Sequence, residues 1–223
     1  MKKLGAFLVG LGLVAGTVFA AATNTATSVN IVGFNKVNCP TNKYVLVSCA
    51  FEAIDGHNLT AQDVFGDQLP LGSSVYAYNN QLNGYDIDNY GFAGWGSTIT
   101  FKGYMGFWIA VPEVEAGPAS YDVSISGQVP MSSAISNTVY SGFTLLGFPY
   151  SASVLWTNTS LAVNAQLGDT VHVWDVGAQA YSSYNLGFSG WGDPNLVLNV
   201  GQGFWFETTS ATFTNTQVRP YNP

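Results

Sequence analysis

The feature that most constrains this chain is an internal repeat. Residues 72–78 read GSSVYAY and residues 168–174 read GDTVHVW, and at the same offset of 96 residues GFAGWG at 91–96 matches GFSGWG at 187–192. After one additional residue in the second copy, GFW at 106–108 matches GFW at 203–205. Self-similarity at one long offset indicates a duplication. We expect two homologous modules, at residues 27–129 and 130–218.

Both copies are predicted to be built from β-strands. Apolar and polar residues alternate with a period of two around Val75 and Val171, and turn residues such as Asn83 separate the strands. The strands of the first copy are expected near residues 29–34, 44–50, 75–78, 99–101, 106–111 and 121–129. Single helical turns are expected only at 60–65 and 161–167. Short strands with dense turns favour an all-β fold of two tandem sandwich or jelly-roll modules.

A resemblance to a known family rests on the second copy. Residues 142–150 read GFTLLGFPY, residues 171–175 read VHVWD, and residues 199–206 read NVGQGFWF. This pattern resembles the small "GWNLIGNPY … GqGFfV" β modules in secreted and surface proteins of Bacteroidota and the Planctomycetes-Verrucomicrobia group. The first copy departs from it, with Ser48 and Cys49 where the Gly-x-Pro stands. The resemblance implies a sandwich-like unit of the cell surface and brings no catalytic residues with it.

The N-terminus predicts export. Lys2 and Lys3 precede an uncharged apolar run that closes on small residues at Ala20 to Ala22, which is typical of a cleaved secretory signal peptide at residues 1–22. An uncleaved anchor is the alternative. No later apolar run approaches the roughly 18 residues of a spanning helix, so we expect no transmembrane segment in the mature chain.

Charge excludes one class of partner. Only 9% of residues are charged, against about 25% in an average domain. Without Lys2 and Lys3, four basic residues face thirteen acids, so no basic patch is available for nucleic acid. Such a surface suits packing against copies of itself or against sugars.

Two cysteines follow the signal peptide. In an exported chain Cys39 and Cys49 are expected to form a disulfide, with two free buried thiols as the alternative. No metal-ligand spacing is present, and no cofactor is expected.

No set of residues predicts an active site. His57 and His172 are expected on a loop and on a sheet surface, and no G-x-S-x-G turn occurs. The stretch from Asp86 to Gly91 faintly resembles a calcium loop, but Ser97 stands where the last acidic ligand belongs, so a hydrated turn is favoured.

The aromatic residues are the informative set. Those that recur in both copies are expected to fill the core of their own module: Trp95, Trp108, Trp191, Trp205, Phe92, Phe188, Phe107 and Phe204. Five further aromatics are candidates for exposed stacking platforms: Tyr76, Tyr78, Tyr85, Tyr90 and Trp156.

These features predict a secreted, non-enzymatic structural protein of the bacterial cell surface or matrix that assembles into a fibre or layer. A carbohydrate-binding or adhesive module is the alternative, with a cell-surface glycan as partner. The segment with Val29, Ile31 and Phe34 is a candidate strand for pairing between copies, and its alternative role is the first strand of its own module.

Overall fold

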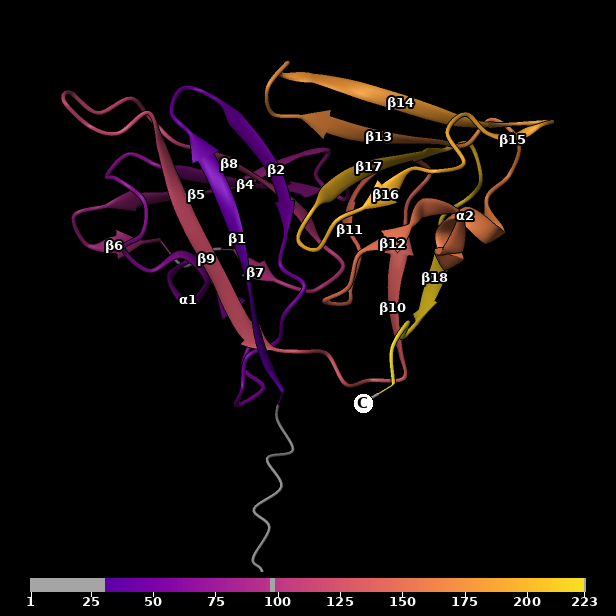
Figure 1. Cartoon of the computed structure of the whole chain (residues 1–223), viewed down its shortest axis with the longest axis horizontal. Coiled ribbons are helices and arrows are strands. Elements are labelled where there is room, and N and C mark those ends of the chain that lie inside the picture. The colour runs from indigo at the N-terminus through magenta and orange to yellow at the C-terminus, as the bar shows by residue number, and fades with distance from the viewer. Residues whose placement is uncertain (1–30, 97–98, 223) are drawn as a thin grey trace, which may run out of the picture.

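The computed structural model describes residues 31–96 and 99–222, which form two consecutive β units (Figure 1). The predicted signal peptide and Val29 lie outside these residues. The first unit contains β1 (Val32–Pro40), β2 (Tyr44–Ser48), β3 (Leu59–Thr60), α1 (Ala61–Phe65), β4 (Ser74–Asn79), β5 (Gly84–Gly91), β6 (Gly94–Trp95), β7 (Thr100–Phe101), β8 (Gly106–Ala110) and β9 (Ser120–Gln128). The second contains β10 (Ala134–Val139), β11 (Gly142–Gly147), β12 (Val154–Leu155), the 3-10 helix η1 (Trp156–Asn158), α2 (Ser160–Asn164), β13 (Thr170–Asp175), β14 (Ala180–Gly187), β15 (Gly190–Trp191), β16 (Val197–Leu198), β17 (Gly203–Thr208) and β18 (Phe213–Val218).

The strand order is the same in both units. The first has an antiparallel sheet with the order β2-β8-β4-β5-β6, and the second has the matching order β11-β17-β13-β14-β15. Each unit adds a two-stranded ribbon, β1-β9 or β10-β18, and a short pair, β3-β7 or β12-β16. The all-β, sandwich-like prediction is therefore confirmed, and every element except η1 has a counterpart in the other unit.

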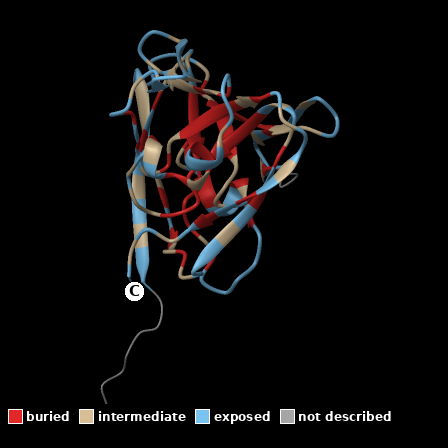
Figure 2. Cartoon of the chain, turned by 90° about the vertical axis from the view of Figure 1, so that its right-hand side faces the viewer, coloured by how far each residue is buried: buried red, intermediate tan, exposed pale blue. Residues whose placement is uncertain are grey.

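Each unit has its own core between the large sheet and the ribbon. In the first unit, Val75 and Ile109 of the sheet meet Val123 and Ile125 of β9, and Phe65 of α1 closes one end. Buried residues accordingly gather between the layers, and exposed residues lie along their outer sides (Figure 2). Among the described residues, no helix is long and apolar enough to cross a bilayer.

Local sequence signals set the short helices. Thr60 caps α1 by accepting from the Asp63 amide while the Asp63 side chain binds the Thr60 amide, a reciprocal capping box. Thr159 caps α2 by accepting from the Ala162 amide. Both caps satisfy amide groups that the first helical turn leaves without a backbone partner.

The two units are joined by matching backbone bonds. The Ser48 amide donates to the Gly201 carbonyl at 2.8 Å, and the Gly147 amide donates to the Tyr104 carbonyl at 2.9 Å. Ser48 is the counterpart of Gly147, and Tyr104 is the counterpart of Gly201. The same contact is thus made twice in opposite directions, as across the two-fold axis of a homodimer.

Two glycines make this close approach possible. A Cβ on Gly106 would stand 2.5 Å from the Leu146 carbonyl oxygen, and one on Gly203 would stand 2.6 Å from the Val47 carbonyl oxygen. These distances leave no room for a side chain. The glycine of the recurring GFW motif is therefore a requirement of the contact between units.

The predicted disulfide is wrong: Cys39 and Cys49 are separate, buried thiols. Cys39 lies on β1, opposite Tyr121 of β9, whereas Cys49 follows β2 of the large sheet, and its sulfur lies 3.7 Å from the Phe51 carbonyl oxygen. Burial raises the pKa of Cys39 to about 12 and that of Cys49 to about 11. Both thiols therefore behave as small apolar core groups.

Candidate functional site

The outer faces of the two large sheets carry the aromatic residues. In β4, Val75 and Ala77 point into the core, so the alternation of the strand places Tyr76 and Tyr78 on the other face. In β13, His172 and Trp174 occupy the two matching positions, on the face of the sheet opposite to the side chain of Val171. The outward-pointing aromatic residues therefore lie on the face of each large sheet that is turned away from the ribbon of its own unit.

The tryptophans of β8 and β17 lie between the units. Trp108 and Trp205 are buried together with Leu46 and Leu145, in a cluster that contains residues of both units. Trp108 contacts Trp174 of the other unit with ring centroids 5.0 Å apart, and Trp205 contacts Tyr78 at 4.8 Å. Trp174 and Tyr78 are counterparts, so this pair of contacts is also two-fold symmetric.

An aromatic pocket opens beside this cluster. It has a volume of about 390 Å³, and no charged side chain lines it. We define the aromatic pocket by its lining residues, which are Tyr44, Tyr76, Tyr85, Trp108, Trp174 and Tyr181. The first four come from one unit and the last two from the other, so the pocket exists only because the units pack together.

The turn between β13 and β14 fixes the far wall of the pocket. Gln179 Nε2 donates to the Tyr44 carbonyl at 3.0 Å, and the Tyr44 amide donates to Gln179 Oε1 at 2.9 Å. Trp174 Nε1 donates to the same carbonyl at 2.9 Å, and Lys43 Nζ donates to the Gly177 carbonyl at 3.1 Å. These bonds hold the two-unit wall in place.

Two tyrosine hydroxyls of the pocket, those of Tyr181 and Tyr85, are held in the neutral form. Burial raises the pKa of Tyr181 to about 12, although the hydrogen bond from Trp205 Nε1 lowers it in part. Burial also raises the pKa of Tyr85, opposed by a hydrogen bond from Trp108. The pocket can therefore accept an uncharged ring through its aromatic faces, with hydroxyls available for polar contacts at neutral pH.

Four of the eight recurring aromatics lie in the core of their own unit as predicted, one of them only in part. Phe107 and Phe204 are buried in their own units. Trp95 is buried with Nε1 donating to the Gly66 carbonyl at 2.9 Å, and its counterpart Trp191 is only half-buried, with Nε1 3.4 Å from the Ala162 carbonyl. Trp108 and Trp205 are buried too, but between the units instead of inside them.

Phe92 and Phe188 were expected in the core, and this is wrong. Phe92 is 99% exposed and Phe188 is 97% exposed. Each follows the last residue of a strand, in the two-residue turn of β5-β6 or β14-β15, and the glycine that ends the turn, Gly94 or Gly190, has a φ of +90° or +101°. The tight turn projects the ring beyond the sheet, away from both cores.

Two of the predicted surface platforms are also misplaced. Trp156 is fully buried, because η1 directs its indole against Trp191 and Phe204. Tyr90 stacks on Trp95 with centroids 5.2 Å apart. Tyr76 and Tyr85 line the aromatic pocket, and Tyr78 packs against Trp205.

The proposed pairing strand is occupied within its own unit. β1 pairs with β9 along its whole length, and the Ile31 carbonyl accepts from the Val129 amide at 2.7 Å. Phe34 remains exposed on this ribbon. The alternative, a first strand of the same module, is therefore what the structure shows for the described part of the segment.

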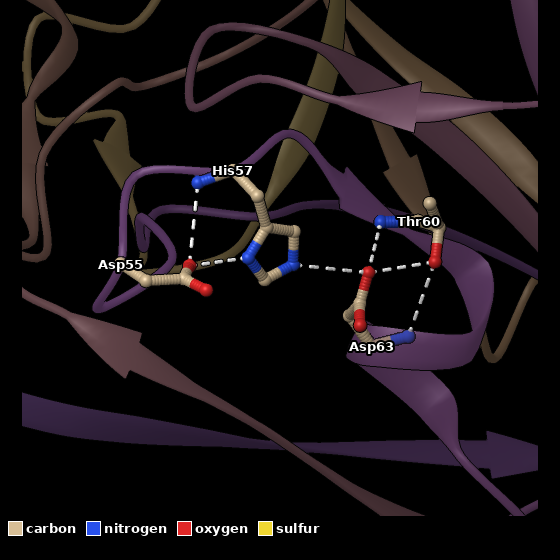
Figure 3. Close-up of polar contacts among 4 residues, drawn as sticks. All are labelled: Asp55, His57, Thr60 and Asp63. Carbon is tan, nitrogen blue, oxygen red and sulfur yellow. Dashed lines mark hydrogen bonds and ion pairs between the residues drawn. The ribbon is translucent and has the colours of Figure 1, made fainter.

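The two histidines contact carboxylates in different settings. His57 lies between Asp55 and Asp63 on the loop before α1, with Nε2 3.3 Å from Asp63, which also binds Thr60 (Figure 3). The hydrogen bond to Asp55 is the main cause that raises the pKa of His57, and it also lowers the pKa of Asp55. The side chain of Asp55 is 74% exposed, that of His57 48% and that of Asp63 35%, so we interpret the contacts as an ion-pair network at the surface.

His172 makes cross-strand contacts on the outer face of the second sheet. Its Nδ1 lies 2.7 Å from the Ser183 hydroxyl, and its Nε2 lies 3.2 Å from Glu207. The first unit has Ile87, Tyr76 and Ala110 at these places, so the set is peculiar to the second unit. Ser183 sits within strand β14 on an exposed face and not on a sharp turn. We therefore interpret the set as a polar cross-strand network.

The acidic residues considered for calcium bind protein groups. Asp88 is buried and accepts from the Gly96 amide at 2.6 Å, while Asp86 accepts from Asn79 at 3.0 Å. Within residues 31–96 and 99–222, no three His, Cys, Asp or Glu side chains gather in a way that could hold a metal ion.

The chain matches no protein-family model, no curated protein and no solved structure. The resemblance to bacterial surface modules therefore stays a prediction.

Proposed function

We propose that this chain is an exported, non-enzymatic structural protein of the bacterial cell surface or matrix that assembles with copies of itself. The observation that carries the proposal is the exposure of Phe92 and Phe188, at 99% and 97%, on matching hairpin turns. Burying a phenylalanine side chain gains about 1.5 to 3 kcal/mol. A chain with two such rings in solvent gains that free energy only when another surface covers them.

The distribution of charge favours the same proposal. Charged residues make up 9% of the chain, and the turns that carry Phe92 and Phe188 contain glycine, alanine and serine beside the ring. No charge would have to be desolvated at these turns when copies meet. The apolar N-terminal run and its small-residue end support export of the chain.

Sedimentation velocity and negative-stain electron microscopy of the purified secreted protein test this function. We expect a concentration-dependent shift to polymers and ordered fibres or layers in the images. Replacing both rings, in Phe92→Ser with Phe188→Ser, should leave a folded monomer. A wild-type protein that stays monomeric at all concentrations up to the millimolar range would overturn the proposal.

A second candidate function is saccharide binding, and the aromatic pocket is the observation that favours it. Uncharged sugar rings have an apolar face that packs on aromatic side chains, with their hydroxyls at the rim. Binding of neutral oligosaccharides to the monomeric Phe92→Ser/Phe188→Ser protein, measured by calorimetry, tests this candidate. The expected loss of that binding in Tyr76→Ala, with Tyr90→Ala as the control outside the pocket, would assign it to the pocket.

A further inference from the structure

The exposed rings cannot reach the aromatic pocket of their own chain. Tyr181 lines the pocket near the start of β14, and Phe188 follows the end of the same strand. A strand rises about 3.3 Å per residue, so the seven residue steps from Tyr181 to Phe188 span roughly 23 Å. Tyr85 and Phe92 are related in the same way along β5. We call the two turns that carry Phe92 and Phe188 the hairpin tips. Any contact between a hairpin tip and the aromatic pocket must therefore join two chains.

The pocket and the tip match in size and chemistry. A cavity of about 150 Å³ is enough to hold a benzene ring, and the pocket has about 390 Å³. Its lining offers only aromatic side chains, which bind another aromatic ring edge-to-face or offset. The tip carries one phenyl ring on a two-residue turn between Gly91 and Gly94, or Gly187 and Gly190, so no bulky neighbour blocks its entry.

We propose that the phenyl ring of a hairpin tip, Phe92 or Phe188, of one copy enters the aromatic pocket of a second copy. This inference rests on the proposed self-assembly and gives it a contact. The surface that donates the ring differs from the surface that accepts it, so the association is head-to-tail. Such a contact repeats from copy to copy, and it leads to a filament where the rotation between copies does not close a ring.

The matched positions Tyr44 and Phe143 supply a sharp test. Tyr44 is 50% exposed and lines the aromatic pocket, while its counterpart Phe143 is 48% exposed and lies outside the pocket. In Tyr44→Glu, the carboxylate would stand at the mouth of the pocket, where a phenyl ring would have to displace its water. Phe143→Glu introduces the same charge at the matching place in the other unit. Circular dichroism and thermal unfolding would establish that both full-length variants are folded.

Sedimentation velocity over a concentration series is the measurement, with total tryptophan emission, to which Trp108 and Trp174 of the pocket contribute, as a second readout. We expect Tyr44→Glu and the Phe92→Ser/Phe188→Ser protein to raise the concentration for half-assembly at least tenfold, with Phe143→Glu within twofold of wild type. N-acetyl-phenylalaninamide at millimolar concentration should dissolve wild-type polymers and shift the tryptophan emission.

The outcomes separate the contact from the function. If the double serine variant is monomeric but Tyr44→Glu assembles as wild type does, the tips bind elsewhere; the pocket contact is then overturned and self-assembly stands. Equal loss in Tyr44→Glu and Phe143→Glu, with both folded, also overturns the contact, because the effect would not depend on the pocket. If wild-type protein never assembles, the proposed function fails together with the contact.

Discussion

Trp205 Nε1 donates a hydrogen bond of 2.9 Å to the hydroxyl of Tyr181. Trp108 makes the corresponding bond to Tyr85, which opposes the effect of burial on the pKa of that tyrosine. Each tryptophan thus ties a strand of its large sheet to a tyrosine two strands away, in a region that the other unit covers. The duplicated chain uses the same residues on both sides of one interface, and that interface creates the aromatic pocket.

Trp205→Ala should lower the free energy of unfolding by roughly 3 to 5 kcal/mol, the range for large buried aromatics. The indole is buried between the units, and its removal leaves a cavity and an unpaired Tyr181 hydroxyl. Urea unfolding followed by circular dichroism measures the change. Phe188→Ser, at a fully exposed position, should stay within about 0.5 kcal/mol and serves as the control. A cost below 1 kcal/mol for Trp205→Ala would contradict the burial of this indole between the two units.

The two thiols should resist modification in the folded protein. Burial raises the pKa of Cys39 to about 12 and that of Cys49 to about 11, so few thiolates form at pH 8. Iodoacetamide should label neither cysteine in the native state and both in urea, as read by intact mass. Finding the pair already oxidised, with no label under denaturing conditions, would show that the predicted disulfide forms after all.

The contributions of His57 and Asp55 to the stability of the fold should depend on pH in opposite directions. The bond to Asp55 raises the pKa of His57 and lowers the pKa of Asp55. The contribution of His57 to stability is complete below its ordinary pKa of about 6.5 and is lost as the pH rises through the folded value. The contribution of Asp55 to stability is complete above a pH of about 3.9 and is lost as the pH falls through the lowered pKa of Asp55 in the folded protein.

NMR titration of the His57 ring protons measures the first of these shifts. Asp55→Asn should lower the pKa of His57 towards 6.5, while Asp55→Glu should retain part of the increase. An unchanged titration in Asp55→Asn would contradict the contact drawn in Figure 3.

The repeat predicts much of the fold because packing residues recur wherever the same backbone recurs. Alternation around Val75 correctly separates a core face from an aromatic face, but it cannot say that a second unit covers the aromatic face. That is why Trp108 was expected inside its own unit. The cysteine pair shows a related limit, since spacing in the sequence does not say that Cys39 lies on β1 of the ribbon while Cys49 follows β2 of the large sheet.

Phe92 and Phe188 show why recurrence alone misleads. A residue repeats in both units when the core needs it and also when a shared surface needs it, so repetition does not distinguish the two. The informative signal was the pair of glycines around a two-residue loop, which is typical of a tight hairpin turn. A large apolar residue in such a turn lies outside the sheet.

The last prediction concerns the glycines of the GFW motif. Gly106→Ala places a methyl group 2.5 Å from the Leu146 carbonyl oxygen, and Gly203→Ala places one 2.6 Å from the Val47 carbonyl oxygen. Both neighbours are backbone atoms of the other unit and cannot rotate away, so we expect each change to cost about 1 to 3 kcal/mol, as overpacking does. Gly91→Ala is the control, because no atom lies within 4 Å of its added methyl group and its φ is not left-handed. Thermal unfolding should give a clearly lower Tm for Gly106→Ala and Gly203→Ala, and a similar Tm for Gly91→Ala and wild type. Because the two contacts are two-fold counterparts, the two losses should be equal within error; a loss in only one variant would show that the units do not meet symmetrically.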